Sequence, residues 1–296
     1  MPKWPKLRSI VSDFNDTDFD SIKTDSNAKA TLLNESDTNL DHLDKDVYRP
    51  YVLSIAGFDP SGGAGLLSDI KTFENNGVYG MGVVTALTWQ NDIAFEKVEW
   101  INANKIISQA EVLLSRFDIR HIKIGLIENI DVLVKVISFL KKQIDDPVIV
   151  YDPILKASAG FVFHHDLARQ MQEIWKSIYC ITPNIPEAQQ LFGAKALQRT
   201  LEENSDIVNI YLKGGHSDES TALDLLFTSD HTYAFSNDRL EKGEKHGSGC
   251  VLSSALTAQL ALGNDLPTAA ENANAYTYQF LGSNDTLLGY HKPLKQ

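Results

Sequence analysis

The sequence is poor in cysteine, in long apolar runs and in positive charge. Only two cysteines, Cys180 and Cys250, occur in 296 residues, too few for a disulfide framework and typical of a reducing compartment. No apolar run could span a bilayer, and no apolar segment follows the basic N-terminus, so neither a membrane span nor a secretory signal is expected. The formal net charge of −12 argues against a nucleic-acid partner. A cytoplasmic protein with a small-molecule ligand, which could be a nucleotide, is therefore expected.

Residues 1–48 differ in composition from the rest of the chain. They are rich in Asp, Asn, Ser and Thr, and their apolar residues are scattered without a period. Such a segment buries too little to offset its ordering, so we predict a disordered acidic tail. A regulatory or partner-docking arm and an upstream mis-start are the alternatives. Residues 49–296 are expected to form a single domain, since the chain is 43% hydrophobic and long enough for a sizeable core.

From Tyr51 onward, strand and helix patterns alternate. Strands are expected over residues 51–59, 81–89, 121–125, 147–152, 178–183 and 207–215, and an antiparallel edge hairpin over 220–235. Helices are expected over 65–77, 102–117, 131–143, 165–176 and 186–193, and two more beginning at Cys250 and Pro267. This alternation predicts an α/β fold of three layers, with a mostly parallel central sheet and helices on both faces.

Glycine and polar residues recur directly after these strands. The segments are GFDPSGGAG (57–65), TWQN (88–91), IKIGLIE (122–128), YDPILKASAG (151–160), TPNIPEA (182–188), LKGGH (212–216) and HGSGC (246–250). Ligands of parallel sheets bind outside the carboxyl ends of the strands, so these segments are expected to surround one site.

Two of these segments could contact a ligand directly. The glycines of 57–65 allow backbone N–H groups to approach a ligand, although the segment is neither a Walker A loop nor a dinucleotide motif. Gln90 can present a donor and an acceptor to a heteroaromatic ring. A plain strand-to-helix turn and a solvated loop glutamine are the alternatives.

Asn184, Glu187 and Lys213 offer groups for phosphate and its metal. Carboxylate and amide oxygens suit magnesium, and a lysine at a strand end can contact a phosphate. The alternatives are helix capping by Asn184 and Glu187, and a surface charge at Lys213.

Cys250 follows two glycines at the start of a predicted helix. Gly247, Ser248 and Gly249 would point backbone N–H groups at one spot and form an anion hole. The helix dipole is expected to lower the pKa of the thiol, so that a thiolate could accept a substrate proton. A small buried residue at a tight helix start is the alternative.

With these segments in this order, residues 50–290 resemble the hydroxymethylpyrimidine/phosphomethylpyrimidine kinases, a branch of the ribokinase-like superfamily. The resemblance rests on SIAGFDPSGGAG, DIKTF, TALTWQN, KIG, TPNIPEA, KGGH and HGSGC. Most of the superfamily has an aspartate general base in the last motif, and this branch has a cysteine. The resemblance implies ATP- and Mg2+-dependent phosphorylation of 4-amino-5-hydroxymethyl-2-methylpyrimidine, and then of its monophosphate, by a homodimer.

The resemblance also implies roles for individual residues. The residues implied to surround the pyrimidine are Gly57, Ala64, Asp69, Thr88, Gln90, Leu126 and Ile154. Those implied to bind Mg-ATP are Asn184, Glu187 and Lys213, with Asp152 and Glu187 at the metal. Gly247, Gly249 and Cys250 are implied to form the anion hole and activate the attacking oxygen.

Three positions depart from the family pattern. Leu126 stands where methionine is common, and Ser248 stands where threonine is usual. Ser158 replaces a frequent lysine, and Lys156 lies two positions earlier, which puts a phosphate contact from this loop in doubt.

Two other functions compete with this interpretation. A pyridoxal kinase of the same branch would use the same cysteine on a similar ring. A non-catalytic pyrimidine-binding protein is the second alternative, although it would be expected to have lost some of the site residues.

Overall fold

The structure is a computed structural model that describes residues 49–154, 174–195, 197–214 and 221–292. The predicted tail, residues 1–48, lies outside the described residues. So do Lys156, Ser158 and most of the helix predicted at 165–176.

The described strands form one mostly parallel sheet. They are β1 Tyr51–Phe58, β2 Tyr79–Gln90, β3 Phe95–Trp100, β4 Ile119–Ile124, β5 Val148–Tyr151, β6 Cys180–Ile181, β7 Asn209–Leu212, β8 Thr221–Phe227 and β9 Thr232–Asp238. Their spatial order is β3-β2-β1-β4-β5-β6-β7-β8-β9. Neighbouring strands from β2 to β7 are parallel, and only the pairs that involve β3, β8 and β9 are antiparallel.

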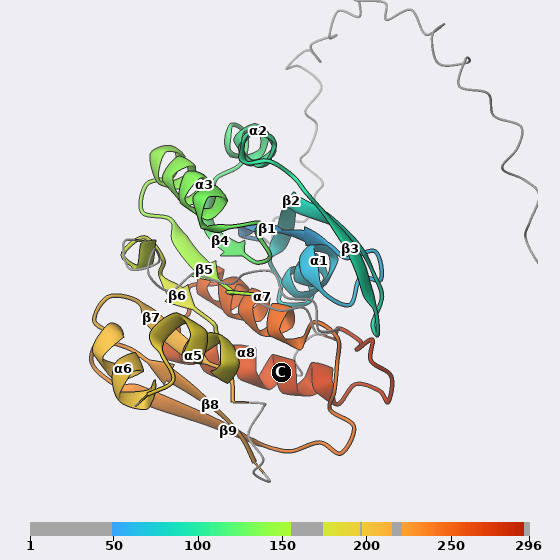
Figure 1. The fold of residues 1–296 in the computed structure, drawn as a ribbon, viewed down its shortest axis with the longest axis vertical. Coiled ribbons are helices and arrows are strands. Elements are labelled where there is room, and N and C mark those ends of the chain that lie inside the picture. The colour runs from blue at the N-terminus through green and yellow to red at the C-terminus, as the bar shows by residue number, and fades with distance from the viewer. Residues whose placement is uncertain (1–48, 155–173, 196, 215–220, 293–296) are drawn as a thin grey trace, which may run out of the picture. The chain divides into compact units, whose positions relative to one another are not determined.

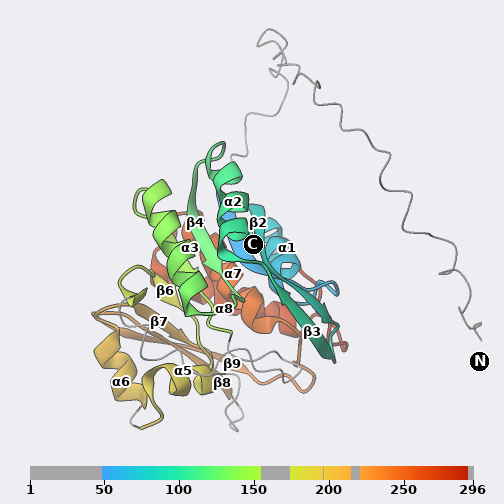
Figure 2. The ribbon, with the colours of Figure 1, turned by 45° about the horizontal axis from the view of Figure 1, so that its top comes forward.

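Helices cover both faces of this sheet (Figure 1 and Figure 2). They are α1 Gly65–Asn75, α2 Ala103–Leu114, α3 Ile130–Gln143, α5 Ile185–Phe192, α6 Leu197–Asn204, α7 Ser248–Ala261 and α8 Leu266–Leu281. One apolar core joins the sheet to α2, α3, α5 and α6, and two further cores join it to α1, α7 and α8. The predicted three-layer α/β fold is confirmed.

The two-residue period of β1 sorts its side chains between the layers. Leu53 and Ile55 belong to the core beneath α2 and α3, whereas Val52 packs toward α1 and α7. Ser54 shares the face of Val52 and hydrogen-bonds to Asp69 of α1. A polar position in a buried strand therefore points at the helices that border the site.

The sequence prediction missed two elements. β3 mixes charged and apolar residues on the edge of the sheet without strict alternation, and α6 has only one fully buried residue, Leu201. Such polar elements lack the apolar periodicity on which the prediction relied. The predicted edge hairpin is confirmed as β8 and β9.

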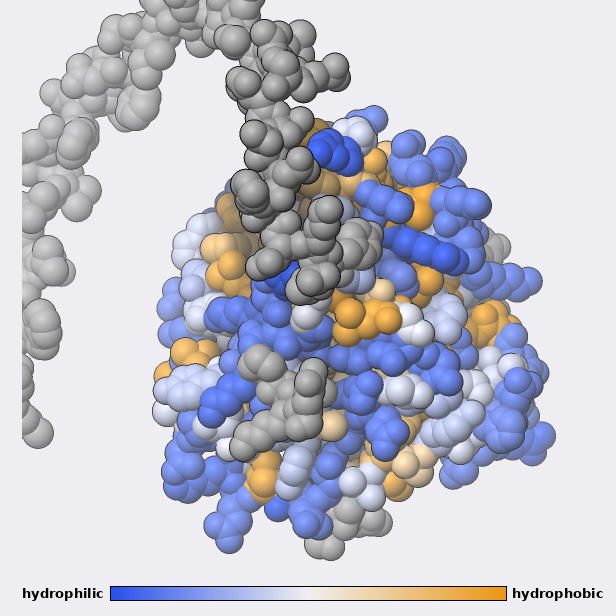
Figure 3. Space-filling model, turned by 180° about the vertical axis from the view of Figure 1, so that it is seen from behind, coloured by the Kyte–Doolittle hydropathy of each residue, from blue (hydrophilic) through white to orange (hydrophobic). Residues whose placement is uncertain are grey.

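Hydrophilic residues predominate on the face shown in Figure 3, and apolar residues there are scattered in small groups. Within the described residues, no helix combines the length and the apolar content that crossing a bilayer requires.

Candidate active site

The site lies where the order of the strands reverses. β1 is flanked by β2 on one side and by β4 on the other. The chain therefore runs toward one edge of the sheet after β1 and toward the opposite edge after β4. Such a switch point is where ligands bind to open parallel sheets, at the carboxyl ends. The loops that leave β1 and β4 touch there, because a Cβ atom at Gly57 would lie only 2.9 Å from Leu126 Cδ2. Two residues predicted to line the pyrimidine pocket are thus in contact.

The loop after β1 is organised by Asp59. Its carboxylate accepts hydrogen bonds from the Ser61 N–H at 2.9 Å, from the Ser61 hydroxyl at 2.8 Å and from the Ala64 N–H at 2.9 Å. The next residue, Gly65, has a φ of +57°, and its N–H lies close enough to the Cys250 sulfur to lower the pKa of the thiol. The loop therefore brings the start of α1 to the predicted catalytic cysteine.

The start of α7 packs directly against this loop. Gly247, the N-cap of α7, has a φ of +79°. A Cβ atom there would lie 2.1 Å from the Gly63 oxygen and 2.7 Å from the Ala64 Cα. Only glycine permits both this backbone conformation and this approach. The first N–H groups of α7, which have no acceptor within the helix, lie beside the glycine-rich loop, as an anion hole requires.

Cys250 is buried, and its ionisation differs from the prediction. Burial raises the pKa of the thiol to about 11. The Lys123 charge and the Gly65 hydrogen bond lower it, whereas Asp69 and Asp152 raise it further. The expectation that the helix dipole would lower this pKa is wrong for this structure, because desolvation outweighs the favourable groups. With this pKa the thiol is mostly protonated at neutral pH, so it can donate a hydrogen bond, and it can accept a proton only in its thiolate form.

Asp69 lies behind Cys250 in a fully buried ion pair. Both of its oxygens contact the Lys123 ammonium group, at 2.8 and 2.9 Å. The hydroxyls of Ser54 and Ser254 donate to the same carboxylate at 2.6 and 2.8 Å. Burial alone would lower the pKa of Lys123, but Asp69 holds it above its usual value. The role of Asp69 at the pyrimidine remains a prediction, since its carboxylate is used within the protein here.

A second ion pair joins the partly exposed Lys213 to the buried Asp152. Lys213 Nζ is 2.8 Å from Asp152 and 3.8 Å from Glu187. Ser253 of α7 donates to Asp152 at 3.2 Å. Burial favours the neutral acid, but the positive charge of Lys213 holds the pKa of Asp152 below its usual value. A Cβ atom at Gly249 would lie 3.2 Å from Lys213 Nζ, so this ammonium group adjoins the anion hole.

Asn184 and Glu187 form the capping box of α5. The Asn184 N–H donates to Glu187 at 2.8 Å, and the Glu187 N–H donates to Asn184 at 2.9 Å. The capping interpretation is therefore confirmed, and it does not exclude a ligand role. Asn184 also pairs with Lys213 in a parallel β-bridge beyond β6 and β7. Three predicted ATP ligands thus come together.

Gln90 and Thr88 line a cavity of about 410 Å³ at the end of β2. Gln90 donates to the Thr88 hydroxyl at 2.9 Å, and this hydroxyl donates to the Phe58 carbonyl at 2.8 Å, next to Gly57. Trp89 also lines the cavity, and Lys97 Nζ lies over its ring, 4.3 Å from the ring centroid. Ile154, the last predicted pocket residue, is half-buried and its N–H donates to the Asp152 carbonyl.

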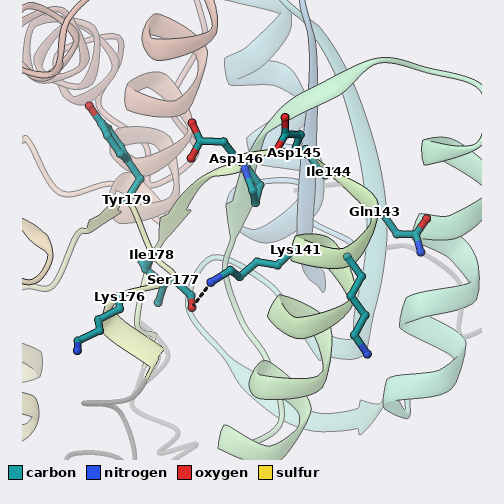
Figure 4. Close-up of a pocket in the computed structure, with 11 residues that line it drawn as sticks. Lys141, Gln143, Ile144, Asp145, Asp146, Lys176, Ser177, Ile178 and Tyr179 are labelled. Carbon is teal, nitrogen blue, oxygen red and sulfur yellow. Dashed lines mark hydrogen bonds between the residues drawn. The ribbon is translucent and has the colours of Figure 1, made fainter.

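A cavity of about 580 Å³ lies elsewhere, before β5 and β6 (Figure 4). Its lining includes Lys141, whose ammonium group points to the Ser177 hydroxyl at 3.1 Å. These segments enter the strands at their amino ends, opposite to the glycine-rich loop. Despite its larger volume, this cavity is separate from the predicted site residues.

Several residues of the site were not assigned a role from the sequence. They are Asp59, Lys123, His246, Ser253 and Ser254. Asp59, Lys123 and His246 lie inside the motifs that were assigned to the site, and this position could have identified them. Ser253 and Ser254 lie in a run of small residues that predicts only close helix packing. Among the described residues, no group of three or more His, Cys, Asp or Glu side chains could hold a metal.

The fold and the groups gathered at its carboxyl edge define a protein of the ribokinase-like class. A sequence model described as phosphomethylpyrimidine kinase matches residues 59–295. The chain therefore belongs to the phosphomethylpyrimidine kinase family.

Relatives of similar length are named as kinases of the same family. A hydroxymethylpyrimidine/phosphomethylpyrimidine kinase of Staphylococcus aureus is 32% identical over 235 residues, which cover 76% of this chain and 85% of the relative. The enzyme of the same name from Haemophilus influenzae is 34% identical over 245 residues, covering 76% and 88%.

Solved structures of two activities share the fold. The phosphomethylpyrimidine kinase of Clostridium difficile has a TM-score of 0.65 and 32% identity, covering 78% of this chain and 99% of that one. The Staphylococcus aureus pyridoxal kinase, in complex with AMP-PCP and pyridoxal, has a TM-score of 0.70 and 25% identity, covering 80% and 89%.

Proposed function

We propose that this chain phosphorylates 4-amino-5-hydroxymethyl-2-methylpyrimidine with ATP, and then phosphorylates the monophosphate to the pyrophosphate for thiamine biosynthesis. The observation that supports this most is the junction at Cys250. There the Gly65 N–H of the glycine-rich loop lies close enough to Cys250 to lower the pKa of its thiol, and the anion-hole turn adjoins Lys213. A substrate hydroxyl held beside the glycine-rich loop and a phosphoryl group held in the anion-hole turn would therefore be adjacent. The names of the family and of the relatives point to the same reaction.

Each group has a role that its position supports. Phosphoryl transfer depends on positioning and on stabilising charge, more than on covalent chemistry. The N–H groups of Gly249 and Cys250 would donate hydrogen bonds to the oxygens of the transferred phosphoryl group, and Lys213 would balance the negative charge of those oxygens. Cys250 would orient the attacking hydroxyl, and its thiolate form would take the hydroxyl proton as the oxygen bonds to phosphorus. Gln90 would read the amino and ring-nitrogen edge of the pyrimidine.

ATP would lie along the carboxyl ends of β6 and β7, beside Asn184, Glu187 and Lys213. Pyridoxal kinases of this fold have been solved with ADP and with AMP-PCP, which supports nucleotide use. The carboxylates of Asp152 and Glu187 fit Mg2+, because this ion usually takes one or two carboxylates and completes its shell with water and phosphate. Bound there, Mg2+ would neutralise charge on the phosphate oxygens.

The experiment is an ATP-consumption assay on the purified chain with Mg2+. The hydroxymethylpyrimidine, its monophosphate and pyridoxal are offered separately. Turnover on both pyrimidines, with little on pyridoxal, is the expected result. Preference for pyridoxal would assign the site to pyridoxal phosphorylation, a candidate that the pyridoxal-bound neighbour favours. Pyrimidine binding without any turnover would indicate a non-catalytic binding protein.

The assay is repeated with Gln90→Ala and with Gln198→Ala, which removes an exposed glutamine on α6 whose side chain donates to Glu202 in the same helix. Loss of one hydrogen-bonding side chain at the ring should raise the KM for the pyrimidine by about tenfold or more. The KM for ATP should stay within about twofold. Equal effects of the two substitutions would remove Gln90 from the pocket.

We also propose a cytoplasmic homodimer. Both cysteines are free thiols, as expected in a reducing compartment. β3 is an edge strand, and Leu87, Trp89 and Ile93 in the adjoining hairpin are exposed apolar side chains. Light scattering of the eluted protein should give twice the chain mass, and a single-chain mass would exclude the dimer.

A further inference from the structure

Two loops of the site approach each other closely at glycine residues. A Cβ atom on Gly247 would lie 2.1 Å from the Gly63 oxygen, and one on Gly63 would lie 2.6 Å from His246 Cδ2. Neither position can hold a side chain without separating the loops. Since side chains cannot interlock here, the distance between the loops depends on whatever bonds them nearby.

Asp59 and His246 provide that bond. His246 Nε2 lies 2.8 Å from Asp59 Oδ2, and both side chains are almost wholly excluded from solvent. The two residues are 187 positions apart in the chain. Asp59 belongs to the glycine-rich loop, and His246 immediately precedes Gly247. The pair therefore joins the pyrimidine side of the site to the anion-hole side.

The direction of this hydrogen bond follows from the other contacts of Asp59. Burial opposes ionisation of Asp59, yet hydrogen bonds from His246, Ser61 and Ala64 outweigh it and lower the pKa of this carboxyl. Asp59 is therefore an acceptor, and His246 Nε2 carries the proton. The other ring nitrogen, Nδ1, is buried and has no hydrogen-bond partner within the described residues. Of the two ring nitrogens, only Nε2 contributes a bond, and this bond is the one to Asp59.

The segment before Gly247 is also fixed from its far side. The His246 N–H donates to the Leu287 carbonyl at 2.9 Å, and Lys245 Nζ donates to the Asn284 carbonyl at 2.7 Å. These bonds hold the segment to the chain end but do not reach the glycine-rich loop. An exposed pair, Lys242 and Asp285 at 2.7 Å, makes a similar attachment a few residues earlier. The neighbouring bonds attach this segment to the chain end, whereas the Asp59–His246 bond attaches it to the glycine-rich loop.

We propose that Asp59 and His246 are positioning residues for the phosphoryl transfer. Their hydrogen bond holds the glycine-rich loop against the turn that contains Gly247 and Cys250. The Gly65 N–H is thereby kept on the Cys250 sulfur, and the anion hole is kept beside the attacking hydroxyl. The inference rests on the proposed function, because it names what sets the distance between the two halves of that site.

The kinetic test compares three variants with the wild type. His246→Leu keeps the size of the side chain and removes the bond, His246→Gln keeps an N–H donor near the Nε2 position, and Lys242→Met removes the exposed pair as a control. His246→Leu is expected to lower kcat for the hydroxymethylpyrimidine about tenfold or more, since small misplacements at a reacting centre have such effects. The KM for ATP should change by less than about threefold. His246→Gln should recover most of kcat, and Lys242→Met should not differ from wild type.

A second measurement does not depend on activity. Amide hydrogen exchange is followed in peptides that cover residues 59–64 and 247–250 of the full chain. In His246→Leu both peptides should exchange about tenfold faster, because local opening of both loops becomes easier. In His246→Gln and Lys242→Met they should exchange as in the wild type. If His246→Leu does not fold, His246→Asn takes its place, since its shorter amide does not reach Asp59.

The outcomes separate the two proposals. A wild type without turnover on any substrate overturns the proposed function, while the exchange measurement still decides whether the pair holds the loops. Wild-type kcat and exchange in His246→Leu overturn the inference. So does a His246→Gln variant as impaired as His246→Leu, because the ring rather than the bond would then matter.

Discussion

The Lys123 ammonium group lies 2.8 and 2.9 Å from the two carboxylate oxygens of Asp69, with both side chains fully buried. Lys123 comes from β4 and Asp69 from α1. Ser254, in the second turn of α7, donates to the same carboxylate. The pair therefore joins three elements directly behind Cys250.

Lys123→Met is expected to destabilise the protein by about 3–5 kcal/mol, because it leaves the Asp69 charge buried without its partner. Urea unfolding measures the loss. The control is Arg199→Met, which removes an exposed ion pair with Glu203 within α6 and should leave the midpoint unchanged. Unfolding of Lys123→Met at the wild-type midpoint would contradict the paired arrangement.

Gly247→Ala and Gly263→Ala form a matched pair of substitutions. Both glycines have a positive φ, +79° and +88°, but only Gly247 has atoms close to the added methyl group. Gly263→Ala should cost about 1–2 kcal/mol from backbone strain alone. Gly247→Ala should cost at least about 1 kcal/mol more, because the methyl group overlaps the Gly63 carbonyl.

Chemical denaturation of the two variants gives this difference, and kcat gives its consequence at the site. Gly247→Ala should also lower kcat, whereas Gly263→Ala should not. Equal stabilities would mean that the two loops are not in contact in solution.

The Cys250 thiol should titrate at alkaline pH. With its pKa raised to about 11 by burial, the thiolate fraction grows about tenfold per pH unit below that value. Iodoacetamide labelling in a Cys180→Ala background, which leaves a single thiol, should accelerate accordingly between pH 7 and 10. A rate that is already constant at neutral pH would restore the lowered pKa that the sequence suggested.

The same background isolates the catalytic effect of the thiol. Cys250→Ser should lower kcat about 10²-fold, the lower end for loss of a proton-transfer group. Cys180→Ala alone should keep the wild-type kcat, since Cys180 is a buried residue of β6 whose side chain packs in the apolar core with α7 and α8. Wild-type turnover in Cys250→Ser at every pH would show that the thiol has no part in proton transfer.

Stability should fall as the pH drops from about 6.5 toward 4. Burial, together with the Arg120 charge, lowers the pKa of His121 from 6.5 to about 4 in the folded protein. Below about 6.5 the unfolded chain therefore binds a proton that the folded chain does not, and acid favours unfolding. His121→Gln should flatten this slope when unfolding free energies are measured across the interval. An unchanged slope would show that His121 titrates alike in both states.

Much of the site was predictable because glycine and polar residues follow buried strands for backbone reasons. Strand ends of a parallel sheet meet at one edge, so GFDPSGGAG, TPNIPEA and HGSGC could be assigned to one site without knowing their contacts. The order of these motifs also indicated the family. β3 and α6 could not be predicted, because half of the residues in β3 are charged and α6 contains only two leucines as apolar residues, so neither segment shows a sustained apolar period.

The sequence by itself determined the α/β class, the edge at which the site lies and the residue types that face it, because apolar periodicity and local turn chemistry act over a few neighbouring residues. Only the tertiary structure decided which charges pair. Lys123 with Asp69, Lys213 with Asp152 and His246 with Asp59 are separated by 54, 61 and 187 positions. It also decided the ionisation of Cys250. The pKa of a buried thiol depends on how much water the surrounding elements exclude, and that exclusion exists only once the helices have packed on the sheet.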